Sequence, residues 1–104
     1  MVDKLILEHY FKEKILRPRT MKSYSQAMQK FTSCMNEVGL SSIQQVTRDN
    51  LLDWRERELR VNGLTAISWN TYCRQLRAVL TFALEQGLVH WPENYFKTLQ
   101  VRTP

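Results

Sequence analysis

One stretch of the sequence repeats apolar residues at the spacing of a single α-helix face. Its members lie three or four positions apart, as 3.6 residues per turn require. They are Tyr24, Ala27, Met28, Phe31, Cys34, Met35 and Val38. The pattern predicts a helix that starts near Arg19 or Thr20 and ends at Gly39, a residue suited to a left-handed helix end. Such a helix must bury its apolar face against other elements, which favours a helical bundle.

Three further segments have the same periodicity, at about residues 3–15, 48–61 and 66–86. The stripe of the first runs to Ile15, and Pro18 breaks that helix. In the third helix the predicted inner face comprises Leu51, Leu52, Arg55 and Leu59, with Trp54 extending it. The aromatic residues at helical spacing are predicted to be core, and these are Trp54, Trp69, Tyr72, Phe82 and Trp91.

The connections between these segments have the composition of helix ends. Thr47 is a suitable N-cap for the third helix, and glycine follows the third and fourth helices. A short turn is expected around Glu93 to Phe96. No segment alternates with the period of a strand. The fold class is therefore predicted to be all-α, a compact four-helix bundle.

The charge of the chain is positive and unevenly placed. The 104 residues carry a formal net charge of +5, with a pI of about 9.5. Residues 1–30 hold seven Lys or Arg against three acids, residues 31–63 hold four against five, and residues 64–104 hold four against two. Such a distribution favours an acidic partner, which could be nucleic acid, an anionic membrane surface or an acidic protein.

The two cysteines, Cys34 and Cys73, are expected to be reduced thiols that face the core. Asp3 and Lys4 interrupt the apolar start, so no secretory signal is predicted. No apolar run approaches the roughly 18 residues of a membrane span. We therefore expect a cytoplasmic protein that makes no membrane contact.

No catalytic pattern stands out in the sequence. His9 and His90 lie at opposite ends of the chain without a recognisable nucleophile or carboxylate partner, and they are expected to be surface or packing residues. There is no glycine-rich phosphate loop, nucleophile elbow or zinc-binding spacing. We expect no catalytic residue, no metal and no cofactor.

The polar faces of the second and fourth helices contain no acid. None occurs between Glu13 and Glu37, or between Glu58 and Glu85. Phosphates repel carboxylates and accept hydrogen bonds from basic, hydroxyl and amide side chains, so these faces are suited to DNA. An ordinary solvated face is the competing interpretation. The third helix mixes both signs densely and is given no DNA role.

Four pieces of the sequence resemble the N-terminal core-binding, SAM-like domain of tyrosine recombinases, the phage-type integrases. They occur in the family's order, at similar separations, and span about residues 3–96. The pieces are Thr20-Met21-Lys22-Ser23-Tyr24 with Phe31, Val46-Thr47-Arg48-Asp49-Asn50-Leu51, Gly63-Leu64-Thr65 with Ser68-Trp69-Asn70-Thr71-Tyr72, and Leu76-Arg77-Ala78-Val79-Leu80 with Phe82-Ala83 and Gly87-Leu88-Val89.

The resemblance implies a four-helix domain that forms half of a C-shaped clamp around duplex DNA, with its second and fourth helices facing the DNA. It implies sequence- or site-associated binding of duplex DNA in integration and recombination by a protein encoded by a bacterium or a phage, with other recombinase protomers as partners of the full-length protein. The family's catalytic domain is not in this sequence, so the chain itself is expected not to be an enzyme and to be monomeric. Residues 1–100 are predicted to be the DNA-binding domain and residues 101–104 the start of a linker.

Two positions depart from the family pattern. Trp91-Pro92 stands where the family usually has Asn-Pro, and Thr71 replaces a basic residue. Five side chains are nevertheless predicted to contact phosphates, and these are Arg19, Lys22, Lys30, Arg74 and Arg77. Five more are predicted to donate hydrogen bonds to phosphates or base edges, and these are Thr20, Ser23, Ser68, Asn70 and Thr71.

Some alternatives remain open at this point. For Arg77, an internal salt bridge competes with a phosphate contact. For the whole chain, the alternatives are a helical protein–protein interaction module with a basic surface and a helical protein that binds a membrane surface.

Overall fold

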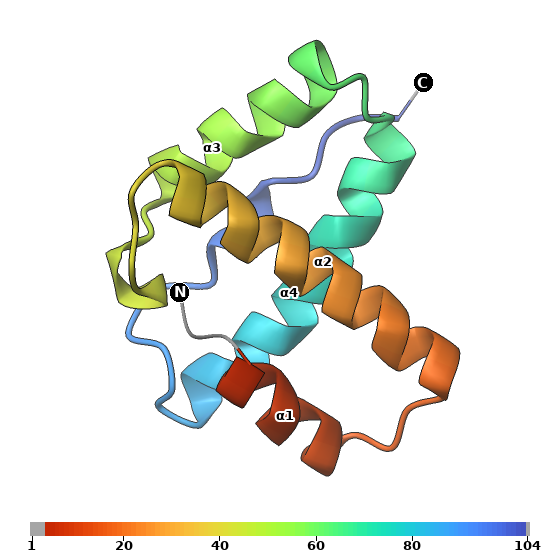
Figure 1. Ribbon diagram of the computed structural model, residues 1–104, viewed down its shortest axis with the longest axis vertical. Coiled ribbons are helices and arrows are strands. Elements are labelled where there is room, and N and C mark those ends of the chain that lie inside the picture. Colours follow the sequence, from red (N-terminus) through yellow and green to blue (C-terminus); the bar gives the residue numbers. More distant parts are fainter. Residues whose placement is uncertain (1–3, 104) are drawn as a thin grey trace.

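The computed structural model describes residues 4–103, in which all regular elements are helical and no strand occurs. The four α-helices are α1 (Lys4–Glu13), α2 (Pro18–Glu37), α3 (Arg48–Glu56) and α4 (Ala66–Glu85). Helix α2 crosses α4, and α1 packs against α4. Helix α3 lies near the C-terminal end of α2 (Figure 1). The predicted all-α class and its four helices are confirmed.

The connection between α1 and α2 differs from the prediction. Helix α1 ends at Glu13, so Ile15 lies outside it and its side chain is fully exposed, at 101%. The prediction of Ile15 as a core residue is therefore wrong. Pro18 is in the first turn of α2, where its missing N–H and fixed φ fit the helix start.

The end of α2 also falls slightly earlier than predicted. The helix stops at Glu37, and Gly39 adopts a left-handed φ of +88°. Val38 is consequently 52% exposed and is not part of the core, contrary to the prediction. Because α2 ends before Val38, the helix does not direct this side chain into the core.

The third predicted helix consists of two kinds of helix. Helix α3 continues as a π-helical segment, η2 (Arg57–Val61), whose wider turn is closed by a 3.0 Å hydrogen bond from the Asn62 N–H to the Arg57 carbonyl. No residue of η2 is fully buried, and its Leu59 packs only partly against the core. Apolar periodicity therefore could not reveal the change.

The inner face of α3 is centred on Leu51 and Trp54, both buried. Leu52 and Leu59 are half-buried and pack against the core, and the half-buried Arg55 donates from Nη1 to the Leu99 carbonyl at 3.4 Å, so the predicted inner face holds. The predicted cap is confirmed, because Thr47 forms a reciprocal capping box with Asn50.

Aromatic side chains make up much of the core, as predicted. The rings of Trp54 and Trp69 meet edge to face with centroids 4.9 Å apart, and those of Phe31 and Phe96 do so at 5.6 Å. Trp91 and Phe82 are also buried, whereas Tyr72 is half-buried. Burial of these large rings supplies much of the apolar surface that stabilises so small a bundle.

The segment after α4 turns back and runs along the bundle to the N-terminal end of that helix (Figure 1). Its short helix η3 is Tyr95–Thr98, two residues later than the predicted turn. The Trp69 Nε1–H donates to the Leu99 carbonyl at 2.8 Å, and Phe96 and Leu99 are buried. Val101, the first residue of the predicted linker, also bonds to the bundle through both its N–H and its carbonyl.

Candidate nucleic-acid interface

Helices α2 and α4 are joined where they cross by side chains of their predicted polar faces. The Gln75 Nε2 of α4 donates to the Ser23 Oγ of α2 at 2.6 Å. About two turns further along α2, the Lys30 Nζ lies 5.9 Å from the centroid of the Tyr72 ring of α4. The two faces therefore meet at one surface.

The five predicted phosphate-contacting residues are all exposed, and none forms an ion pair with another described residue. We call these residues, together with the predicted hydroxyl residues of the same two helices, the α2/α4 face. Its members are Arg19, Thr20, Lys22, Ser23, Lys30, Ser68, Thr71, Arg74 and Arg77. The alternative of an internal salt bridge for Arg77 finds no support among the described residues.

The hydroxyl groups of this face differ in the hydrogen bonds that they already form within the chain. Ser23 accepts from Gln75, and Ser68 accepts from the Thr65 hydroxyl at 3.0 Å, so both oxygens have a partner within the chain. Thr71 donates to the Ile67 carbonyl and accepts from Arg74 at 3.4 Å, a contact that orients the guanidinium. Thr20 is half-buried beside Arg19.

Asn70 has a structural role that the sequence did not indicate. Its Nδ2 donates to the Val101 carbonyl at 2.8 Å, and its Oδ1 accepts from the Val101 N–H at 2.9 Å. Both polar groups of the amide are thus engaged by the backbone of the C-terminal segment. We therefore leave Asn70 out of the α2/α4 face, and its contact with DNA stays an untested prediction.

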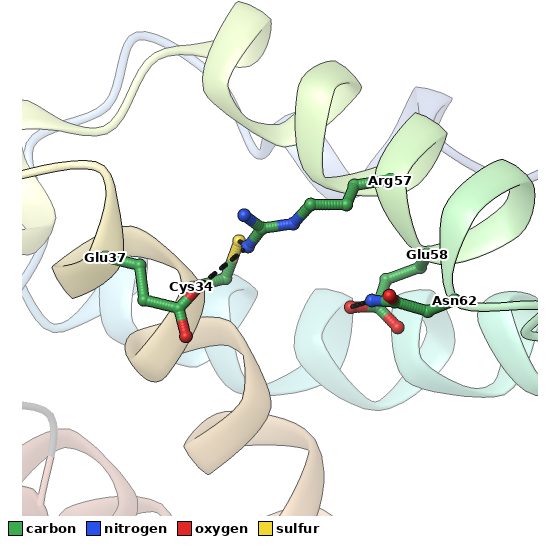
Figure 2. A network of polar contacts seen from close by, with 5 residues as sticks. All are labelled: Cys34, Glu37, Arg57, Glu58 and Asn62. Carbon is green, nitrogen blue, oxygen red and sulfur yellow. Dashed lines mark hydrogen bonds and ion pairs between the residues drawn. The ribbon is translucent and has the colours of Figure 1, made fainter.

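The ion pairs of the described residues lie elsewhere, around α3 and η2. Arg57 Nη2 contacts Glu37 Oε2 at 3.1 Å and Cys34 Sγ at 2.7 Å, and Asn62 donates to Glu58 at 3.2 Å (Figure 2). Arg60 pairs with Glu56 at 3.6 Å. The arginines of η2 are therefore paired with acids, whereas the five cations predicted on α2 and α4 are exposed and form no ion pair with a described residue.

A polar groove of about 770 Å³ lies beside this network, between α2 and η2. Its charged lining is balanced, with Lys30 and Arg57 against Glu37 and Glu58. Cys34 also lines it, but burial raises the pKa of the Cys34 thiol despite the nearby Arg57 guanidinium. The thiol is therefore protonated at neutral pH and is a poor nucleophile.

Both cysteines are buried and free, as predicted. Burial raises the pKa of Cys73 to about 12. Among residues 4–103, no group of three or more histidine, cysteine or acidic side chains is arranged to hold a metal ion. None of the described helices is long and apolar enough to cross a bilayer.

A second groove, of about 400 Å³, brings Lys14 together with Arg74 and Arg77. The sequence pattern did not predict Lys14 at this surface. Its backbone N–H bonds to the Tyr10 carbonyl at 2.9 Å, so it lies one turn beyond a residue that packs on α4. The apolar spacing of the first helix was the signal that could have placed Lys14 near α4.

A comparison of the sequence with known families identifies the domain. The family model described as the phage integrase N-terminal SAM-like domain matches residues 4–87. The chain belongs to this family. Residues 88–101, which complete the core of this SAM-like domain here, lie beyond the matched region.

Two curated relatives of this SAM-like domain are named as the tyrosine recombinase XerC. The protein from Pseudomonas syringae is 33% identical over 96 residues, which cover 92% of this chain and 19% of the relative. The protein from Pseudomonas aeruginosa is 30% identical over 105 residues, which cover 100% of this chain and 24% of the relative. The chain thus spans about a fifth to a quarter of their lengths. No solved structure gives a significant match.

Proposed function

We propose that this chain binds duplex DNA through the α2/α4 face, as the N-terminal part of a site-specific tyrosine recombinase that acts in DNA integration or recombination. The observation that carries the proposal is the segregation of charge. The cations Arg19, Lys22, Lys30, Arg74 and Arg77 form no ion pair with a described residue, whereas both ion pairs of the described residues involve arginines of η2, Arg57 and Arg60. An unpaired basic surface attracts the phosphate backbone.

The proposed contribution of the chain is binding and orientation, and strand cleavage belongs to the catalytic domain of the parent protein. The family also implies contacts with other recombinase protomers. In this scheme the domain acts as half of a clamp. Joining it to a second DNA-binding half would raise the affinity through effective concentration.

Fluorescence anisotropy with a short labelled duplex tests the proposal. We expect the affinity of the unmodified chain to fall steeply between about 50 and 200 mM salt, because binding releases counterions from the DNA. Lys22→Glu and Arg74→Glu should each weaken binding at low salt by about tenfold or more. Arg60→Glu is the matched control, since it makes the same charge change on the α3 side.

Equal losses in all three variants would mean that net charge alone governs binding and would reject the α2/α4 face. An unmodified chain without measurable affinity at low salt would reject DNA binding by this chain. That result would favour the alternative of a protein-interaction module with a basic surface.

A further inference from the structure

The groove between α1 and α4 has the charge of an anion-binding surface. Three of its lining side chains are the cations Lys14, Arg74 and Arg77, and its one acid is Glu85. All four of these charged residues are exposed. The larger groove beside η2, by contrast, holds equal numbers of cations and acids. Of these two grooves, the one between α1 and α4 is therefore suited to a polyanion.

The floor of this groove is apolar and rigid. Tyr10 of α1 and Phe82 of α4 are buried, with ring centroids 5.6 Å apart in an edge-to-face contact. Tyr10 also stacks on Tyr24 of α2 at 5.8 Å, which fixes α1 relative to both long helices. The position of Lys14 beside α4 is thus set by core packing.

Thr81 offers a hydroxyl donor within the same groove. The buried Asn94 donates from Nδ2 to the Thr81 Oγ1 and to the Arg77 carbonyl, both at 2.9 Å. Its Oδ1 accepts from the Phe96 N–H, which defines the orientation of the amide. Because the Thr81 oxygen accepts this hydrogen bond, its own hydroxyl hydrogen remains available to an acceptor such as a phosphate oxygen.

The groove is continuous with the α2/α4 face. Arg74 belongs to both, and it directly precedes Gln75, which contacts α2 at the helix crossing. A phosphate backbone that follows α4 past its crossing with α2 would therefore enter the groove. An extended polyanion is the occupant that fits one basic surface running from α2 across α4 to α1.

We propose that the groove between α1 and α4 holds a stretch of DNA phosphate backbone, and that Lys14, the residue directly after α1, is a phosphate-contacting residue. This inference rests on the proposed DNA-binding function and extends the binding surface to a third helix. Glu85 then sits at the end of the groove and opposes binding by repelling phosphate.

Lys12 provides a matched control for Lys14. It is an exposed lysine two positions earlier, which places it about 200° around the helix and outside the groove. Lys14→Gln should weaken duplex binding several-fold and reduce the slope of log affinity against log salt by about one. Lys12→Gln should leave both quantities close to those of the unmodified chain.

Glu85 supplies a test in the opposite direction. Glu85→Gln should tighten duplex binding, because it removes the acid from the groove, whereas Glu8→Gln on α1 should not. A gain in affinity cannot arise from damage to the fold. Circular dichroism of each variant gives an independent measure of folding.

The outcomes separate the two proposals. If Lys22→Glu and Arg74→Glu lose affinity while Lys14→Gln matches Lys12→Gln and Glu85→Gln has no effect, this inference is overturned and the proposed function stands. If the unmodified chain does not bind duplex DNA at low salt, both fail.

Discussion

The Gln75 side chain of α4 donates its 2.6 Å hydrogen bond to Ser23 of α2, while its own Oε1 is buried and has no hydrogen-bond partner among the described residues. One half of the amide thus ties two helices together, and the other half carries a desolvation cost. This contact fixes the point where the two acid-free faces meet. It therefore links the stability of the bundle to the shape of the proposed interface.

Removing either side of this contact should have unequal effects. Ser23→Ala leaves both polar groups of the Gln75 amide without a partner, so it should lower the free energy of unfolding by about 1–3 kcal/mol. Gln75→Met removes the amide and should cost less. Urea unfolding of the two variants and the double variant gives the coupling energy. Strict additivity would show that the hydrogen bond contributes nothing.

Asn70 should affect stability and leave the DNA contacts unchanged. Asn70→Ala removes both hydrogen bonds to Val101 and should destabilise the domain by about 1–3 kcal/mol. The salt dependence of duplex binding should remain that of the unmodified chain under conditions where the variant is folded. Unchanged stability together with a lower affinity would return Asn70 to the interface.

The segment after the family-matched region should be essential for folding. A chain that ends at Gly87 lacks Val89, Trp91, Phe96 and Leu99, all of which are buried. At about 1.5–3 kcal/mol for each fully buried apolar side chain, this loss is comparable to the whole stability of a typical domain. Thermal circular dichroism should show no cooperative transition. A chain that ends at Val101 is the control and should melt cooperatively, and similar melting of both chains would contradict the prediction.

Alkaline pH should destabilise the domain through Cys73. Burial raises the pKa of this thiol in the folded state from an ordinary value of 9.0 to about 12. The folded chain then holds the proton more tightly than the unfolded chain, so the contribution is complete below about pH 9 and is lost as the pH rises toward 12. In this range the free energy of unfolding should fall, through this thiol alone, by up to about 1.4 kcal/mol per pH unit.

Urea titrations between pH 8 and 11 measure this effect. The variant Cys73→Ala should show a shallower decline, and the slopes are compared because the substitution itself changes the packing. Part of the decline should remain, since burial also raises the pKa of Cys34 and Tyr10. An identical slope in Cys73→Ala would show that this thiol titrates normally.

The sequence alone determined the fold class, the four helices and most of the core. These features depend on local periodicity and on helix ends such as Thr47 and Gly39, which are legible without knowing which helix packs on which. It also identified the acid-free faces of α2 and α4. An absence of acids along a segment is a property of the sequence itself.

Only the tertiary structure decided which polar residues share a surface. Lys14 joins Arg74 because Tyr10 packs against Phe82, and Asn70 turns to Val101 because the C-terminal segment returns along the bundle. Ile15 and Val38 follow the apolar spacing but lie just beyond helix ends, so Ile15 is fully exposed and Val38 is only half covered. Contacts between residues distant in sequence depend on how whole helices cross, and the period of a single helix carries no information about that crossing.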